Sequence, residues 1–533
     1  MSTPAPADRS TATAAAPVPA TGSGERAGAA ERLARVPTTA WSAALAFVVT
    51  AVAVVWPNRA LFSVALPEVG DAAANSLLVN QAKDLELLVG HYSRVGFNHP
   101  GPAVLYVQAA GEGLLHDLLG LVPAPYNGQA IAVMLLSAAV VAAVVAVVHR
   151  WAGTWAAAAA GLAWSLVWFA FHEFSLGSPW IPVLVVAPFL LLLVSAASVA
   201  SGHPEHVWLL ALVSGLLVHA HVAFVLPVGV LVPAALAALV LGERGGPVAV
   251  ARRHRRRLLV AGGVAGLFVA PIALNTLLNW PGEIPKYAGY SGDQAVSRPS
   301  PSEAVAFTLQ FWAEDDTLDR VVPVVLTAAA VAAVVLAPRA LRRPLAALTA
   351  TALIAQALFV VYALVGVDDL SQVYVGYFGW ALPAALGLVV VTSLAARARS
   401  ASAQAVVATA SALAMVAGLV AADAPFRLRP EFAADLPPAL AAVDEELGDV
   451  DGPVVVDMTE TVPAFLGGTG LLLHLERAGV DACVADDVFR VQVGARRICS
   501  QEELAQGRWV EVRDPGTAPR PTVQHGLSDF TVR

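Results

Sequence analysis

The side chains best suited to chemistry are concentrated between the first and second apolar runs of the sequence. From Asn80 the chain reads NQAKDLELLVGHYSR, followed by VGFNHPGP and the apolar AVLYVQ. Carboxylate, imidazole, phenol and cationic groups are the side chains that transfer protons and stabilise anions in enzymes. This stretch is therefore the first place to look for a reactive site.

A helix over this stretch would separate its two carboxylates. Asp84 and His91 are seven residues apart and would share one helix face, whereas Glu86 would lie about 200° round from Asp84. Only one carboxylate could then point into a given site. The sequence His99-Pro100-Gly101-Pro102 is expected to end that helix and to begin another that lies on the membrane surface.

Composition indicates which elements must hold these residues. Of the 533 residues, 57% are hydrophobic and 14% are charged, whereas a soluble domain carries about 25% charged residues. The apolar residues form runs of about 17 to 25, the length of a helix that crosses roughly 30 Å of hydrocarbon. We expect an all-α polytopic membrane protein with eleven spans, at residues 40–56, 128–148, 152–170, 180–199, 206–220, 223–241, 258–278, 320–337, 344–366, 373–395 and 403–421.

Arginines set the expected orientation of the chain. Arg26, Arg32 and Arg35 precede the first run and predict a cytoplasmic N-terminus. The apolar stretch 206–242 would be about 55 Å long as one helix, so we divide it at His219 and His221, which also makes the basic cluster 252–257 cytoplasmic. The expected organisation is a disordered cytoplasmic tail (1–38), a transmembrane domain (39–421) with its first external loop at 57–126, and an extracytoplasmic domain (422–533).

The C-terminal region has the pattern of a small α/β domain. Residues 452–457, 481–485 and 509–513 are predicted strands, and 463–478 a predicted helix. The only two cysteines, Cys483 and Cys499, fall in a part expected to face an oxidising compartment, which favours a disulfide over two buried thiols. Such a bridge stabilises by about 3 kcal/mol in the chain-entropy model. The Cys-x15-Cys spacing without paired histidines does not suit a metal site.

This arrangement resembles the GT-C superfamily of membrane glycosyltransferases, particularly the bacterial relatives of protein mannosyltransferases and of the aminoarabinose transferases. Members open with one span and a long external loop that carries an acidic residue and a nearby tyrosine, then a proline-rich step into a membrane-parallel helix. Asp84, Tyr92 and the residues His99 to Pro102 stand at those places here. The segment from Tyr374 to Pro383 is similar to a later polar and aromatic segment of the family, and a soluble external domain after the last span is also a family feature.

The resemblance implies a hexosyl- or pentosyltransferase of a bacterial plasma membrane. It would take a sugar from a polyprenyl-phosphate donor, invert the anomeric centre and deliver the sugar to an envelope glycan, lipid or protein. Asp84 would be the general base, and because members often carry adjacent acids, the Asp-Leu-Glu sequence leaves Glu86 as the alternative. Cationic groups would stabilise the departing lipid phosphate, and the candidates are Lys83, Arg94, His219, His221, Lys286 and Arg298. The remaining candidates for substrate contact are His91, Tyr92, His99, Tyr374 and Tyr377. A divalent metal assists some members, and nothing in the sequence requires one.

Other interpretations of the same residues stay open. Asp84 could be a solvated surface group, and His219 and His221 could serve packing alone. Trp180 and Trp380 lie near span ends, where an aromatic belt facing the membrane lipids is the default. A transporter or lipid flippase would show internal repeats and charges inside spans, and a non-catalytic scaffold would bind an envelope partner through the C-terminal domain. Nothing indicates nucleic-acid binding, because the formal charge of -8 belongs to loops and tail.

Overall fold

The computed structural model describes residues 38–172, 176–293, 298–313, 318–422, 425–428, 436–450, 452–518, 521–524, 526 and 528–533. All but the last residue of the tail expected at 1–38 lies outside this part. Among the described residues, nine helices are long and apolar enough to cross a membrane, and two shorter apolar helices lie at Trp155–Ala170 and Pro204–Ala220. The prediction of an all-α protein that crosses the bilayer many times is confirmed.

The principal elements follow one another along the chain in this order: α2 (Thr38–Val55), α3 (Asp71–Lys83), α4 (Ala103–Glu112), α5 (Pro125–Ala152), α6 (Trp155–Ala170), α7 (Ile181–Leu184), α8 (Val186–Ala200), α9 (Val207–Ala220), α10 (Val225–Gly242), α11 (Gly246–Arg253), α12 (Arg255–Leu278), α13 (Ile284–Asp293), α14 (Pro301–Leu309), α15 (Leu318–Leu336), α16 (Arg339–Val365), α17 (Ala381–Ala395), α18 (Ala401–Ala421), α19 (Leu436–Leu447), β1 (Val454–Met458), α20 (Val462–Arg477), β2 (Ala482–Val484), α21 (Arg490–Val493), α22 (Gln501–Gln506), β3 (Arg508–Arg513), β4 (Val523–Gln524) and β5 (Asp529–Val532).

The spans differ in how much of their apolar surface meets other helices. α8 is almost wholly buried and packs against α5, α9, α10, α16 and α17. α18 is also apolar but almost unburied, and Val406, Leu413 and Val420 on it are each more than half exposed. A helix that is apolar all round and exposed in this way is stable where hydrocarbon surrounds it. These outer faces are therefore the ones that meet lipid.

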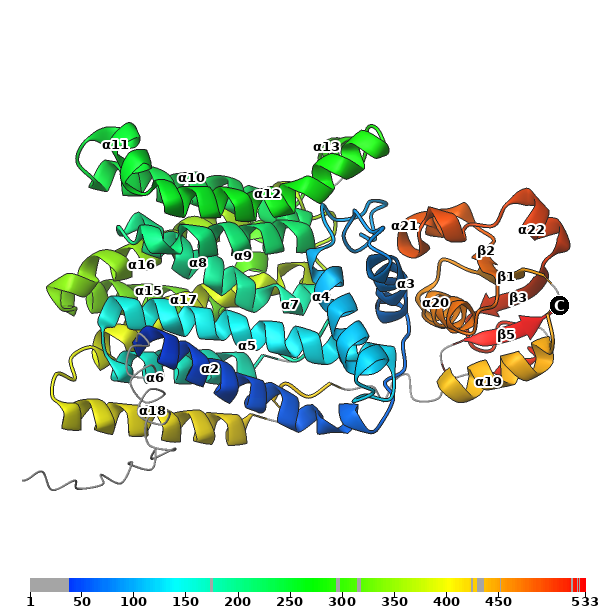
Figure 1. Cartoon of the computed structure of the whole chain (residues 1–533), viewed down its shortest axis with the longest axis horizontal. Coiled ribbons are helices and arrows are strands. Elements are labelled where there is room, and N and C mark those ends of the chain that lie inside the picture. The colour runs from blue at the N-terminus through cyan, green and yellow to red at the C-terminus, as the bar shows by residue number, and fades with distance from the viewer. Residues whose placement is uncertain are drawn as a thin grey trace, which may run out of the picture.

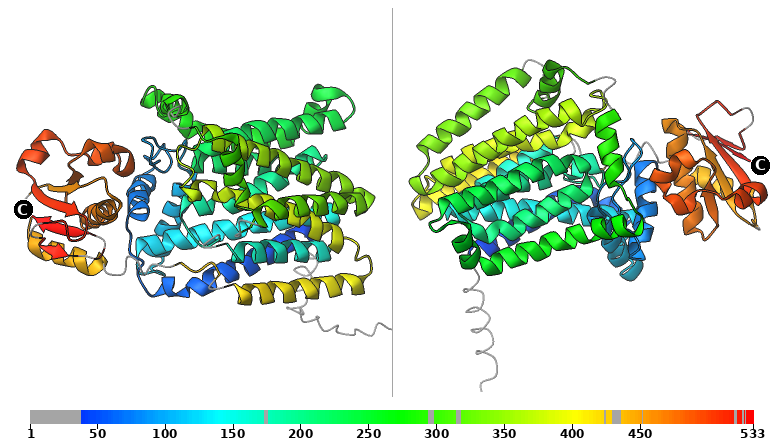
Figure 2. Two further views of the ribbon diagram at one scale, coloured as in Figure 1. Left: turned by 180° about the vertical axis from the view of Figure 1, so that it is seen from behind. Right: turned by 90° about the horizontal axis from the view of Figure 1, so that it is seen from above.

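The long connections gather at one end of the bundle. α3, α4, α13 and the C-terminal domain all lie at that end, and the arginine-bearing α11 lies at the opposite end (Figures 1 and 2). α3 and α4 run across the direction of the spans, and α3 lies between α4 and the C-terminal domain. Residues far apart in the sequence can therefore form one site at this end.

The loop after the first span differs from its prediction in one respect. The helix is α3, which ends at Lys83, and Leu85 has a φ of 62°. A left-handed residue cannot continue an α-helix, so the expectation that Asp84 and His91 share a helix face is wrong. From there the chain forms a hairpin, in which the amide of Gly90 donates to the carbonyl of His99 at 2.8 Å. α4 begins directly after Pro102, where the proline-rich step was expected to start a helix.

The C-terminal region folds around a five-stranded sheet. Its strand order is β2-β1-β3-β5-β4, with β1 parallel to both neighbours and β5 antiparallel to β3 and β4. Val454, Val456 and Val510 are fully buried in it. A disulfide joins Cys483 of β2 to Cys499, the pairing expected from the sequence. The prediction of a small C-terminal α/β fold is confirmed.

Candidate active site

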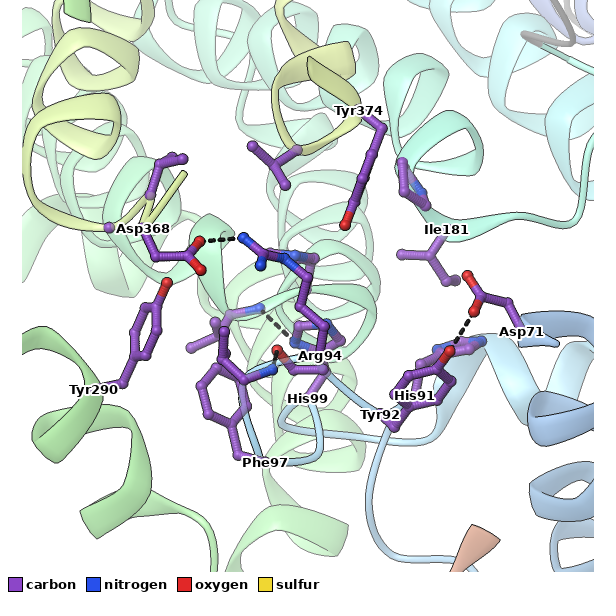
Figure 3. A pocket seen from close by; sticks show the side chains of 18 of the residues that line it. Asp71, His91, Tyr92, Arg94, Phe97, His99, Ile181, Tyr290, Asp368 and Tyr374 are labelled. Carbon is purple, nitrogen blue, oxygen red and sulfur yellow. Dashed lines mark hydrogen bonds and ion pairs between the residues drawn. The ribbon is translucent and has the colours of Figure 1, made fainter. Parts of the chain in front are cut away.

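A cavity of about 180 Å³ opens where the connections meet (Figure 3). Its walls come from the start of α3, the hairpin over residues 91–99, the start of α7, the turn before α10, α13, and the chain on either side of residue 368. The lining is rich in charged, phenolic and imidazole groups: Asp71, Asn75, His91, Tyr92, Arg94, His99, Trp180, His221, Tyr290, Tyr362, Asp368 and Tyr374.

Asp71 is the first residue of α3 and points into this cavity. Its Oδ1 accepts a hydrogen bond from the hydroxyl of Tyr92, and its Oδ2 accepts one of 2.9 Å from the indole Nε1 of Trp180. Gly70 precedes it with a φ of 53°, a conformation that glycine adopts without strain. The N-terminal end of a helix favours negative charge. Burial and the Asp71 carboxylate both raise the pKa of Tyr92, so this phenol remains a donor.

Arg94 is the one Lys or Arg side chain that lines this cavity among the described residues. It forms an ion pair with Asp368, and Figure 3 shows its side chain in the space between Asp368 and Tyr374. Burial and the neighbouring Asp368 carboxylate raise the pKa of Tyr290. The cavity thus combines two carboxylates, one guanidinium group and neutral phenols.

Three histidines line the cavity together, of which His91 and His99 are buried and His221 is partly buried. The rings of His99 and His221 lie 4.1 Å apart between centroids, and His91 is 3% exposed. Burial lowers the pKa of His91 to about 3 and that of His221 to about 4, and it lowers the pKa of His99 well below the ordinary value. Burial therefore favours the neutral form of all three rings, which argues against the positive charge expected of His221.

His219 is not among the lining residues and instead connects two helices. Its Nδ1 accepts from the amide of Ala103 at 3.3 Å, and its Nε2 lies 2.6 Å from the carbonyl oxygen of Phe268. A carbonyl oxygen can only accept, so Nε2 carries the proton. The ring therefore ties the first turn of α4 to α12 and lies outside the cavity.

α13 covers one side of the cavity. The hydroxyl of Tyr287 donates to the carbonyl of Asn98 at 2.6 Å, and the amide of Asn98 donates to Glu283 at 2.9 Å. Phe97 packs edge-on against Tyr287 and Tyr290, with ring centroids 5.1 and 5.7 Å apart. The hairpin that carries Arg94 is therefore held against α13.

A second cavity of about 390 Å³ lies on the other side of Asp71. It shares Asp71, Asn75 and Trp180 with the first cavity. Its remaining lining is mostly apolar and includes Leu66 and, from the C-terminal domain, Leu466. The Asp71 carboxylate thus lies at the boundary between a polar cavity and an apolar one.

Six of the residues named from the sequence line the polar cavity, and seven lie elsewhere. The seven are Lys83, Asp84, Glu86, His219, Lys286, Arg298 and Tyr377. Lys286 pairs with Glu283 at 2.8 Å, and Tyr377 stacks on Trp380 with ring centroids 4.4 Å apart. Arg298 lines a separate cavity of about 930 Å³ that shares Asp368 with the first.

The two carboxylates favoured as general bases are both exposed. Asp84 follows the last residue of α3, and Glu86 lies 3.5 Å from Arg496. Lys83 is held by Glu112 at 2.8 Å and Asp117 at 2.6 Å. Neither Asp84 nor Glu86 lines a described cavity. The carboxylates that line the polar cavity are instead Asp71 and Asp368.

The cavity residues that the sequence did not single out as site residues include Asp71, Trp180, Tyr290 and Asp368. Asp71 had a detectable signal, because an Asp directly after a Gly and before an Ala-rich run is typical of a helix start. Trp180 had the pattern of a belt residue, and Asp368 that of a solvated turn. Their positions in the cavity depend on contacts between residues more than 100 positions apart in the sequence, which local patterns do not reveal.

Within the part of the chain that the structure describes, no group of three or more His, Cys, Asp or Glu side chains could hold a metal ion.

Comparison with known proteins supports the fold. No family model matches this sequence, and no curated protein matches it. Among solved structures, ArnT from Cupriavidus metallidurans in the apo state is similar, with a TM-score of 0.54 and 14% identity, over 93% of this chain and 98% of ArnT. ArnT is an aminoarabinose transferase of the GT-C superfamily. The chain therefore has the GT-C-like fold that its sequence suggested.

Proposed function

We propose that this protein is a GT-C-type membrane glycosyltransferase that moves a sugar from a polyprenyl-phosphate donor to an acceptor hydroxyl, with Asp71 as general base. The observation that carries the proposal is the Asp71 carboxylate, which two donors orient at the boundary between a polar and an apolar cavity. The GT-C-like fold supports the same reaction class.

The chemistry needs a base that is fixed and accessible. Tyr92 and Trp180 each occupy one lone pair of the carboxylate, and the remaining lone pairs are free to accept a proton. As the acceptor oxygen bonds to the anomeric carbon, its proton passes to Asp71 and the bond from that carbon to the phosphate oxygen breaks. Polyprenyl phosphate leaves with the electron pair, and attack opposite the leaving group inverts the anomeric centre.

The leaving phosphate needs a positive partner. Arg94 is suited to this role because a guanidinium group binds phosphate oxygens through two parallel hydrogen bonds. The neutral His91, His99 and His221 can exchange hydrogen bonds with sugar hydroxyls, and Tyr374 offers a phenol on the opposite wall. The apolar cavity would accommodate a hydrophobic part of one substrate beside the base.

A direct test is product analysis with purified protein. A panel of polyprenyl-phosphate hexoses and pentoses is incubated with a bacterial envelope lipid extract, and both polyprenyl phosphate and glycosylated products are measured by mass spectrometry. We expect release of polyprenyl phosphate in equal amount to the new glycoside. If an unmodified sugar-lipid is instead moved between the leaflets of a liposome without cleavage, the protein is a flippase and the proposal is wrong.

A further inference from the structure

The helix that carries Asp71, α3, packs on both sides and contributes to two separate hydrophobic clusters. One of its faces contributes to the hydrophobic cluster of the C-terminal domain, together with residues from α19, α20 and the sheet. Its other face packs against Leu87 and Val89, which precede the hairpin, and against α4. The first face holds Ala73 and Leu77, and the second holds Leu78, Val79 and Ala82. α3 is therefore part of the core of the C-terminal domain, although it precedes that domain by more than 350 residues.

A buried arginine of the C-terminal domain is hydrogen-bonded to this helix. Arg497 is 3% exposed, and its Nη2 donates to the carbonyl of Leu77 in the middle of α3 at 2.9 Å. The same guanidinium group donates to both carboxylate oxygens of Glu476, at 2.5 and 2.8 Å. Glu476 in turn accepts from the side chain of Asn80, also on α3, at 2.9 Å. The pair thus holds the backbone and a side chain of α3 at once.

The same domain contacts the end of α3 that bears the carboxylate. The amide of Gly70 lies 3.4 Å from the carbonyl of Leu466, and a side chain on Gly70 would come within 2.4 Å of Leu466. Phe465 packs edge-on against Tyr92, the phenol that donates to Asp71, with ring centroids 6.1 Å apart. The domain is therefore in contact with the first turn of the helix and with the partner of its carboxylate.

The disulfide links the segment that carries Arg497 to the sheet. Cys499 follows Arg497 by two residues, and Cys483 lies in the edge strand β2, which pairs with β1. Between the two cysteines, α21 packs on α3, and Val491 accepts from the side chain of Asn98 in the hairpin at 3.4 Å. The cross-link closes the segment that touches both α3 and the hairpin.

We propose that the C-terminal domain is part of the catalytic apparatus, with Arg497 as a positioning residue. Resting on the proposed function, this inference assigns to the Arg497–Glu476 pair the task of fixing α3 so that Asp71 meets Tyr92 and Trp180. Misplacement of a reacting group by about 1 Å costs on the order of 100-fold in rate. Loss of the hydrogen bonds from Arg497 therefore lowers the rate of the chemical step rather than the affinity for substrate.

The test compares Arg497→Lys with Arg496→Ala in the full-length protein. Arg497→Lys keeps the charge but cannot reach both Glu476 and Leu77, and Arg496→Ala removes a neighbouring, exposed cation. For Arg497→Lys we expect kcat to fall roughly 10- to 100-fold with KM unchanged, together with faster hydrogen–deuterium exchange in residues 71–83. Arg496→Ala should leave kcat, KM and this exchange unchanged.

A second variant guards against misfolding. In Arg497→Met combined with Glu476→Met, no charge is left unpaired in the buried site, and such apolar replacements often preserve stability. The inference expects low kcat here too, because neither methionine bonds to α3. Wild-type kcat in Arg497→Lys, or unchanged exchange in α3, would overturn it, and a raised KM with normal kcat would make the domain a substrate-binding element instead. If the wild-type protein transfers no sugar, the proposed function fails, and the exchange measurement alone decides whether Arg497 holds α3.

Discussion

Replacement of Asp71 by asparagine is the most informative single perturbation of the polar cavity. The indole of Trp180 can only donate, so it will face the amide oxygen of the new side chain. The amide nitrogen then faces the hydroxyl of Tyr92, which can turn and accept. Both contacts survive, so the variant should fold and insert normally while lacking a group that can take a proton.

The size of the effect follows from the role of the carboxylate. A positioned general base contributes about 10²- to 10⁴-fold to rate, which corresponds to about 3 to 5.6 kcal/mol of the barrier at roughly 1.4 kcal/mol per tenfold. We expect kcat for Asp71→Asn to fall by this factor, with little change in KM because the binding contacts remain. Initial rates of polyprenyl phosphate release measure both quantities.

Asp84→Asn is the matched control, because it makes the same chemical change on an exposed residue one helix length away. It should retain wild-type kcat. An Asp71→Asn protein that is folded and as active as wild type would refute the assignment of the base, and loss of activity in Asp84→Asn alone would return that role to Asp84.

Three further predictions concern the guanidinium, the histidines and the disulfide. Arg94→Gln should weaken transfer by about 10- to 100-fold, since a hydrogen bond to a charged group contributes about 1.5 to 3 kcal/mol; Lys286→Gln, at an exposed pair, should have no effect in the same rate assay. Because the pKa values of His91 and His221 are lowered in the folded protein, the unfolded chain binds protons between about pH 6.5 and pH 4 that the folded protein does not bind. The melting temperature in detergent should therefore fall as the pH drops through this range. The fall should be less steep in His221→Asn. Joint replacement of Cys483 and Cys499 by serine should lower the free energy of unfolding of the C-terminal domain by about 3 kcal/mol and should speed its proteolysis. Equal resistance to the protease with and without the disulfide would contradict this.

Much of the fold was predictable because it depends on local signals. Hydrocarbon thickness fixes the length of a span, so apolar runs alone identified most of the bundle. The expected strand at 452–457 and the helix at 463–478 correspond closely to β1 and α20, because buried strands and amphipathic helices leave periodic patterns. The division of residues 206–242 at His221 also agrees with the break between α9 and α10.

The carboxylates of the polar cavity were not predictable in the same way. Choosing between Asp71 and Asp84 requires knowledge of where α3 begins and ends, and a shift of helix boundaries reverses which of them faces the cavity. Trp180, which orients Asp71, is 109 residues away from it, and Asp368, which pairs with Arg94, is 274 residues from Arg94. Whether residues so far apart in the sequence come into contact depends on tertiary packing, which local sequence patterns do not reveal.

The Arg94–Asp368 pair has a consequence for which anions this cavity can retain. Its fixed charges are two carboxylates and one guanidinium group, a net formal charge of -1. Because Asp368 already balances the charge of Arg94, a phosphate that binds there shares the guanidinium group with this carboxylate rather than meeting a lone cation. Inorganic phosphate therefore gains less charge stabilisation here than at an unpaired arginine. A phosphodiester that also brings a sugar ring and a long hydrocarbon tail gains additional contacts with each part, so discrimination against common cellular anions is built into the charge balance of the cavity.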